Sequence, residues 1–315
     1  MVRLSSRLLI NGIVCGTGGL MATGAAALGS DGRAAGYAVS PSAEFTPLIP
    51  RRSGDAVTFT ALLDRAAIKA TSGGRAREIT TRQLPLAIGI AGAHLFLNLG
   101  GIREMRWHNS AEWAYILAGQ CHVTVTDPAG GFKVANCGPG DLWYFPTGHA
   151  YAIQTFGGEP CHAILAFNDG LYSEHGTCGL SDLISRLDPA TLAQETGVPP
   201  GALDGIPCGE VYIRQGGIIT DDGPEAAVAQ ALDAARTHRH RLGTARPWFE
   251  GSGGVIRVAS AREFPLSTDM TGVVTRLKPG ARHAPHWHPN ANEWLYVARG
   301  RVRTTMYAAD SCGLC

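Results

Sequence analysis

The chain has 315 residues, a formal net charge of +1 at pH 7, and apolar residues at 45% of its composition. This balance of charge gives no electrostatic reason to expect nucleic acid or an anionic membrane surface as a partner. The length suits two domains of ordinary size plus an N-terminal extension. The 41 glycines and 18 prolines fit many short strands joined by tight turns.

Residues 1–30 are typical of a targeting segment. Arg3 and Arg7 precede an apolar run of small residues that carries no charge until Asp31. This pattern predicts a secretory signal, and therefore a secreted or periplasmic protein, with a cytoplasmic protein and a disordered tail as the alternative. Glycines interrupt the run, so no stable membrane span is expected. Residues 31–75 are predicted to form an N-terminal arm.

Residues 76–178 are predicted to form a complete β-barrel, barrel 1. Strand-like runs of about seven to nine residues alternate there with turn signals, which favours an all-β barrel or sandwich. The sequence Asp-Pro-Ala-Gly-Gly at 127–131 indicates a hairpin loop.

Residues 179–245 are predicted to be a helical linker. Asp188 is placed to cap a short helix, with Pro189 in its first turn and Gly197 after its end. A second helix is predicted over the alanine-rich residues 223–242. His238 and His240 lie one residue apart at its polar, basic end, which we interpret as a solvated face and not as a ligand pair.

Near the end of the chain, His286-Trp287-His288 is followed by Glu293. Imidazoles one residue apart share a face if they lie on a β-strand, because strand side chains repeat with period two. A carboxylate five residues later can meet them from the next strand or turn. Two nitrogens and one oxygen suit manganese, iron, zinc or a similar divalent ion.

The pattern around this motif occurs twice. Residues 103–126 align with residues 283–306, because Trp-His, Glu-Trp and a following glycine recur in the same order. The wide separation of the copies indicates a domain duplication and not a short repeat. Residues 246–315 are therefore predicted to belong to a second barrel, barrel 2.

These motifs resemble those of the cupin family. Residues 100–119 and 280–300 resemble the first cupin motif, and residues 138–156 resemble the second. Among cupins, the two-barrel oxalate decarboxylases are the most similar. The resemblance implies an all-β bicupin built from double-stranded β-helix (jelly-roll) barrels, with a few short helices. It also implies oxalate as a small dicarboxylate substrate, manganese as the metal, dioxygen as redox co-substrate, and a homo-oligomer such as a trimer or hexamer.

The resemblance also implies roles for individual residues. In barrel 1 the substrate clamp would be Arg103 and the proton donor would be Glu174. The alternative for Arg103 is a structural salt bridge. The implied metal ligands are His108 and Glu112 in barrel 1, and His286, His288 and Glu293 in barrel 2.

Barrel 1 departs from the family pattern at two of its four ligand positions. Arg106 stands where the family has the first histidine, and Tyr151 stands where the second motif supplies one. A guanidinium cannot ligate a metal because it stays protonated. His149 shares the strand parity of Tyr151 and could replace the missing imidazole, or it could be a loop histidine.

The second cupin motif does not recur in residues 294–315. We therefore expect one complete barrel and an incomplete second one, as in a frameshifted or truncated gene product. The function expected is manganese-dependent conversion of oxalate to formate and CO2, with impaired activity. Oxalate oxidase chemistry and a non-catalytic binding cupin are the alternatives. Cys137 could form a disulfide with Cys121 or Cys161 after export.

Overall fold

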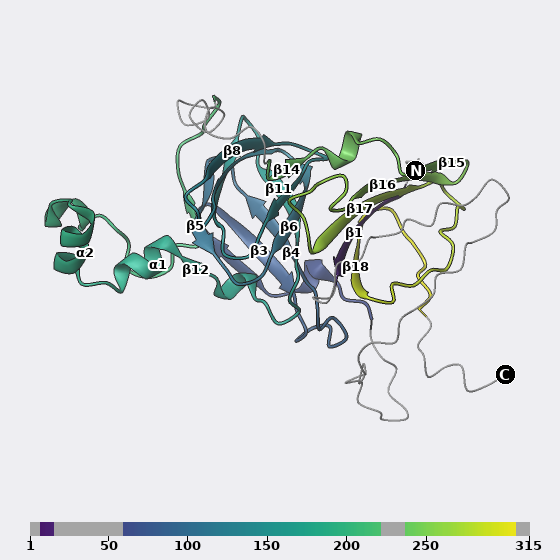
Figure 1. Cartoon of the computed structure of the whole chain (residues 1–315), viewed down its shortest axis with the longest axis horizontal. Coiled ribbons are helices and arrows are strands. Elements are labelled where there is room, and N and C mark those ends of the chain that lie inside the picture. Colours follow the sequence, from purple (N-terminus) through teal and green to yellow (C-terminus); the bar gives the residue numbers. More distant parts are fainter. Residues whose placement is uncertain (1–6, 16–58, 222–236, 307–315) are drawn as a thin grey trace.

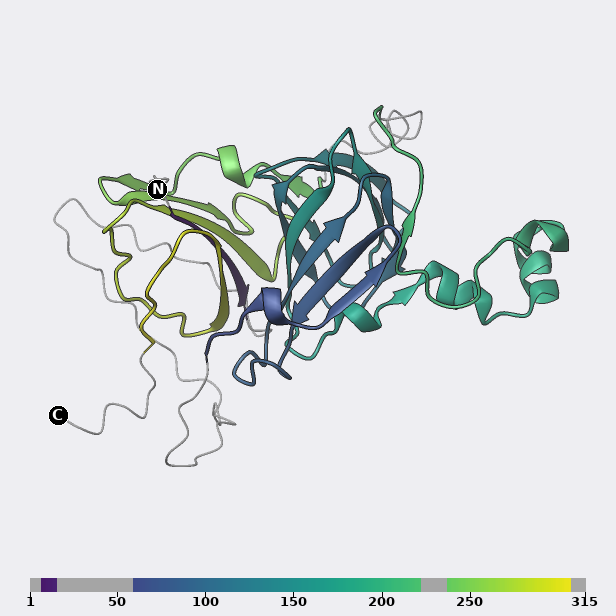
Figure 2. The same cartoon turned by 180° about the vertical axis from the view of Figure 1, so that it is seen from behind.

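The computed structural model describes residues 7–15, 59–221 and 237–306. A barrel made of two sheets lies beside a further, open sheet (Figures 1 and 2). One sheet of the barrel has six strands, in the order β12-β5-β10-β7-β8 with β13 also on β5, and the other has seven, in the order β14-β9-β6-β11-β4-β3-β2. The described chain is thus mostly β-structure with a few short helices, which confirms the predicted fold class. The barrel strands are β2 (Ile68–Thr71), β3 (Gly74–Ile79), β4 (Ala91–Leu97), β5 (Gly101–Trp107), β6 (Glu112–Ala118), β7 (Gln120–Thr126), β8 (Phe132–Cys137), β9 (Leu142–Phe145), β10 (Ala150–Phe156), β11 (Cys161–Phe167), β12 (Cys178–Gly179), β13 (Ile213–Gln215) and β14 (Arg239–His240).

The core of the barrel follows from the period-two burial of its strands. Along β10 every second residue is buried, so Tyr151 and Ile153 point inward. They meet Leu165 and Trp143 from the seven-stranded sheet in one apolar cluster. At the predicted hairpin loop, the side chain of Asp127 accepts hydrogen bonds from two backbone N–H groups, which confirms the turn.

The barrel sheets recruit strands from outside the predicted boundaries 76–178. Strand β2 comes from the segment predicted to be an arm, and β13 and β14 come from the predicted linker. Strand β13 pairs with β5 so that Ile213 lies opposite Arg103. These strands cover sheet edges whose N–H and C=O groups would otherwise be unpaired.

Two short helices extend away from the barrel after β12 (Figure 1). The second is the predicted helix that follows Asp188, whose side chain accepts a hydrogen bond from the Thr191 N–H at 2.9 Å. Gly197 ends it with φ of 72°, a left-handed conformation that glycine adopts without steric cost. The helical elements are α1 (Leu180–Ser185), α2 (Pro189–Thr196), and the 3₁₀ turns η1 (Leu63–Arg65), η2 (Glu174–Gly176), η3 (Pro200–Leu203) and η4 (Leu242–Thr244).

The interpretation of His238 and His240 as a solvated helix face is wrong. Residues 222–236 lie outside the described residues, but 239–240 form strand β14, which pairs with β9. His238 is buried, and the His240 ring stacks on Phe264 with 5.4 Å between centroids. Pairing with a distant strand overrides the local helical pattern here.

The open sheet has five strands in the order β15-β16-β17-β1-β18. Strand β1 (Arg7–Cys15) lies between β17 and β18, and it comes from the segment predicted to be a targeting signal. In the β1–β18 register, Ile13 lies opposite Glu293. Export of the protein stays a prediction. The remaining strands are β15 (Phe249–Gly251), β16 (Gly254–Ala259), β17 (Met270–Leu277) and β18 (Ala291–Arg299).

The open sheet packs against the seven-stranded sheet of the barrel. Trp113 and Ile164 of the barrel share a buried cluster with Val274 and Trp294 of the open sheet. The backbones approach closely where glycine permits it, since a Cβ on Gly92 would lie 2.2 Å from the Trp294 ring. Burial of this apolar surface holds the two parts together.

In the part of the chain that the structure describes, Cys121, Cys137 and Cys161 are buried free thiols, and neither of the two possible disulfides is present. Cys121 and Cys137 lie opposite each other on β7 and β8. They pack in the barrel core as small apolar side chains. No helix among the described residues is long and apolar enough to cross a membrane.

Candidate functional site

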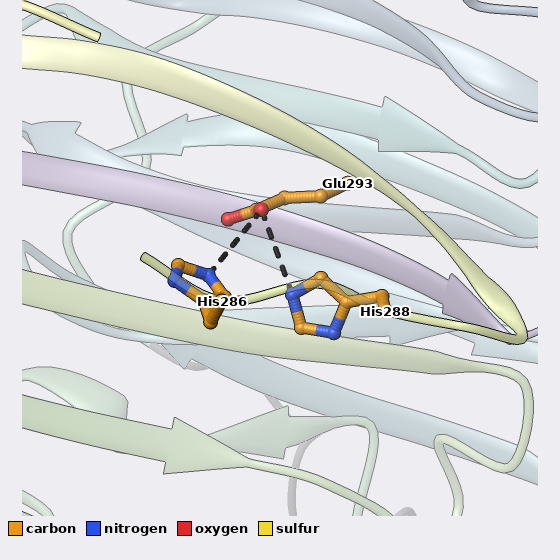
Figure 3. A group of neighbouring side chains, drawn as sticks. All are labelled: His286, His288 and Glu293. Atoms are coloured by element: carbon orange, nitrogen blue, oxygen red, sulfur yellow. Dashed lines mark ion pairs between the residues drawn. The ribbon is translucent and has the colours of Figure 1, made fainter. Parts of the chain in front are cut away.

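The three barrel 2 ligands predicted from sequence converge on one point (Figure 3). The Nε2 atoms of His286 and His288 lie 3.7 and 3.5 Å from one carboxylate oxygen of Glu293. The potential ligand atoms of all three residues lie within 4.8 Å of one another. Glu293 is on β18, but the two histidines precede that strand in an extended loop and not in a strand as expected.

The donor set fits a divalent cation. Two imidazole nitrogens and one carboxylate oxygen suit manganese, iron or zinc. His286 is oriented by its Nδ1, which lies 3.0 Å from the backbone carbonyl oxygen of Ala284, so its Nε2 is left to face Glu293. Within the described residues, the buried Nε2 of His288 has no hydrogen-bond partner, and it lies 3.5 Å from the Glu293 carboxylate.

The barrel 2 site is open to solvent. The side chains of His286 and His288 are 43% and 30% exposed, and that of Glu293 is 25% exposed. His283 lies beside them, with its ring centroid 4.6 Å from that of His286. Burial and the neighbouring His286 lower the pKa of His283, which favours its neutral form near pH 7. An exposed three-ligand site leaves coordination positions for water or a small anion.

In barrel 1 the carboxylate of Glu112 is bound by the protein's own donors. The Tyr151 hydroxyl donates to Oε2 at 2.6 Å, and the Trp143 indole N–H donates to Oε1 at 3.2 Å. His108 Nε2 lies 3.4 Å from Oε2. Burial acts to raise the pKa of Glu112, but hydrogen bonding and the charge of His108, together with Arg103, outweigh it and lower the pKa. Glu112 is therefore a buried, ionised carboxylate with both oxygens engaged.

Barrel 1 contributes no group of three potential metal ligands among the residues that the structure describes. Arg106 on β5 and Tyr151 on β10 lie directly opposite each other in the sheet register. The Arg106 guanidinium donates to the backbone carbonyl of Tyr212 at 3.3 Å and cannot ligate. His149 does not replace the missing imidazole: it faces the loop carbonyl of Thr147 and packs 5.8 Å from the His238 ring.

The structure brings the two other predicted site residues of barrel 1 together. Arg103 and Glu174 form an ion pair in which both side chains are at most 1% exposed. The hydroxyls of Tyr172 and Tyr212 lie 3.4 Å from the two Glu174 oxygens. The turn η2 that carries Glu174 is anchored by Glu78, which accepts from the Ser173 hydroxyl and the His175 N–H.

Sequence reasoning missed two residues of this site, Trp143 and Tyr212. Trp143 lies in the second cupin motif, and strand parity with Phe145 would have placed it inward. Tyr212 comes from the predicted linker, and nothing in its local sequence marks it. Its φ of 64° is in the left-handed region, which is rare for a residue other than glycine.

Comparison with known families identifies this architecture. The family model described as Cupin matches residues 60–200 and 240–311. The chain belongs to the cupin family. The match includes both copies of the duplicated motif, which confirms the family resemblance predicted from sequence.

The curated relatives of this cupin are oxalate decarboxylases. It is 35% identical over 244 residues to oxalate decarboxylase OxdC of Bacillus subtilis, an alignment that covers 76% of this chain and 61% of the relative. It is 36% identical over 236 residues to a probable oxalate decarboxylase of Arthroderma benhamiae, covering 75% and 58%. The chain thus spans about three fifths of the length of these relatives.

Solved structures show the same similarity. A structure of Bacillus subtilis oxalate decarboxylase that was studied for its Mn(II) centres matches with a TM-score of 0.62 and 30% identity, covering 68% of this chain and 56% of that one. The structure of the same enzyme at pH 4.6 matches with a TM-score of 0.62 and 28% identity, covering 73% and 64%. The fold of this chain is that of an oxalate decarboxylase-like bicupin.

Proposed function

We propose that this chain is an oxalate decarboxylase-like cupin that binds a divalent metal, manganese, at His286, His288 and Glu293. The observation that carries the proposal is the convergence of these three donor groups, whose ligand atoms lie within 4.8 Å of one another. The relatives named as oxalate decarboxylases, and the solved relative with Mn(II) centres, support oxalate and manganese as substrate and metal.

In this proposal the bound metal supplies a Lewis acid that holds one carboxylate of oxalate. The residues around the metal determine whether oxalate can also be clamped and protonated at this site. The two neutral imidazoles and one carboxylate leave a +1 charge on a divalent ion, which attracts a dianion. Oxalate can approach because the site is exposed to solvent.

The residues that would clamp oxalate and deliver a proton lie in barrel 1, away from this metal centre. Arg103 and Glu174 are buried and paired with each other, and their neighbour Arg106 stands at a ligand position. Acid catalysis requires a carboxyl group within hydrogen-bond reach of the reacting atom. We therefore propose that oxalate turnover by this chain is weak, because clamp and proton donor are not beside a complete metal site.

The test is equilibrium Mn²⁺ binding to the full chain, followed by electron paramagnetic resonance, with His288→Ala as the perturbed variant. His149→Ala is the matched control, because that histidine is in the other domain and faces a loop. We expect one Mn²⁺ per chain for wild type and for the control, and at least tenfold weaker binding for His288→Ala. Wild-type-like affinity in His288→Ala would overturn the proposed site.

Product analysis with oxalate separates the reactions. Slow release of formate with CO2 supports the decarboxylase, and its dependence on dioxygen tests the proposed co-substrate. Hydrogen peroxide with CO2 would instead identify an oxalate oxidase. Tight Mn²⁺ binding with no product would make the chain a binding protein. Formate release at the rate of an efficient enzyme would contradict the proposal of weak turnover.

A further inference from the structure

We propose that barrel 1 is a metal-independent binding site for a small monocarboxylate, held between the guanidinium groups of Arg103 and Arg106. The site is separate from the metal centre of the open sheet and does not require it. It extends the carboxylate-binding role of Arg103 to a second arginine at a position where a metal ligand was expected.

Both guanidinium groups are completely buried, and most of their donors have no acceptor. Arg103 and Arg106 are each 0% exposed. The Nε and Nη1 atoms of both side chains lack any hydrogen-bond partner among the described residues. The contact of Arg106 with the Tyr212 carbonyl is long, at 3.3 Å. Buried N–H groups in proteins are nearly always paired, so four unpaired donors in one core point to an acceptor beyond the described residues, for which we propose a bound carboxylate.

Both guanidinium groups lie buried next to the same aromatic ring. Their central carbons are 4.9 and 5.2 Å from the centre of the Tyr212 ring. Burial, and then the positive charge of Arg103, lower the pKa of Arg106. An anion that contacts both would relieve this repulsion. The planar fork of N–H donors on each guanidinium matches the two oxygens of a carboxylate.

The charges in barrel 1 favour a monoanion over a metal ion. Arg103 and Arg106 are balanced by Glu112 and Glu174, of which Glu174 is ion-paired with Arg103. A monocarboxylate that replaces Glu174 on Arg103 keeps the buried charge unchanged. A divalent cation would add two positive charges next to Arg106 in a low-dielectric core, which is unfavourable.

Glu174 therefore acts as an internal competitor for the site. Its carboxylate already occupies one of the positions that an external carboxylate would take on Arg103. It is carried by the short turn η2, so its release from Arg103 requires this turn to give up its hydrogen bonds with Glu78. Tyr151, Tyr172 and Phe167 belong to the same buried cluster of the barrel core. We therefore choose formate, the smallest carboxylate, as the probe.

The experiment is titration of the full chain with sodium formate by isothermal calorimetry, in EDTA and at constant ionic strength set with chloride. We expect wild type to bind formate, Arg106→Met to bind at least tenfold more weakly, and Glu174→Gln to bind several-fold more tightly. Arg262→Met is the control, because that arginine side chain is 85% exposed; its affinity should equal that of wild type.

The variants are informative in opposite directions. Loss of affinity in Arg106→Met supports the site if circular dichroism and Tm show a folded protein. If that variant does not fold, Glu174→Gln decides, since unchanged or weaker binding there would overturn the proposal. Formate binding that requires added Mn²⁺, or no binding by either wild type or Glu174→Gln, would also overturn it. EDTA removes the proposed metal centre from the measurement, so failure of the oxalate function does not affect this result.

Discussion

Replacing Arg106 and Tyr151 together with histidine should give barrel 1 a metal site that it now lacks. The two positions lie directly opposite each other on β5 and β10, and both side chains are fully buried. Tyr151 already contacts His108 and Glu112. Opposed residues on antiparallel strands have Cβ atoms about 5 Å apart, which allows two imidazoles to share one ion with the existing pair. The double variant would present three histidines and one glutamate.

The expected change in stability follows from the Tyr151 contacts that are lost and from the Mn²⁺ ion that is gained. Tyr151 is fully buried, donates to Glu112 at 2.6 Å and stacks on Phe145 with 4.0 Å between ring centroids. Its loss should destabilise the metal-free variant by about 2–4 kcal/mol. Mn²⁺ at a hundred times its Kd should restore about 2.7 kcal/mol. For a domain of this size, that corresponds to a rise in Tm of about 5–10 °C.

The assay is metal content after dialysis against Mn²⁺, with Tm measured at several Mn²⁺ concentrations. The double variant should hold one Mn²⁺ per chain more than wild type, and the His288→Ala background should keep only that additional ion. The single variants Arg106→His and Tyr151→His are the controls, because each still lacks one ligand. A folded double variant that gains no Mn²⁺ would refute the reasoning from strand register.

Three further predictions concern pH, thiols and the first strand. Burial, and then the neighbouring His149, lower the pKa of His238 to about 4, so its neutral form is favoured in the folded state. The unfolded chain therefore takes up the proton first, and the free energy of unfolding should fall by up to about 3 kcal/mol as pH drops from 6.5 to 4. Urea unfolding at pH 7 and 5 should show this loss of stability, and the loss should be smaller in His238→Gln. An equal loss in both proteins would contradict the prediction. Burial raises the pKa of the Cys121 thiol well above its ordinary value, so this thiol should react slowly. Peptide mapping after brief iodoacetamide treatment of the native protein should find the exposed Cys178 alkylated and the buried Cys121 not. Equal labelling would show that the barrel core is accessible. Deleting residues 1–15 should weaken Mn²⁺ binding, measured by equilibrium dialysis, at least tenfold. The reason is that β1 is the one strand paired with β18 in the described chain, and β18 carries Glu293. Unchanged affinity would show that the metal centre does not need β1.

Local motif and strand periodicity account for what the sequence could predict. The ligands His286, His288 and Glu293 were predicted from spacing, and the structure brings their donor atoms together. The α2 cap at Asp188 depends on contacts within a few residues, so sequence determined it as well. The prediction failed at His238, because there a pairing with the distant β9 replaces the helix that its neighbours favour.

The sequence by itself determined the family, the duplicated motif and the substitutions at Arg106 and Tyr151, because these are properties of residue identity and spacing. Only the tertiary structure decided what surrounds them. It placed Glu174 on Arg103, and it placed Tyr212 against both arginines through the pairing of β13 with β5. Such contacts join segments far apart in the chain, and they depend on which sheet edges remain unpaired and which buried charges need a partner.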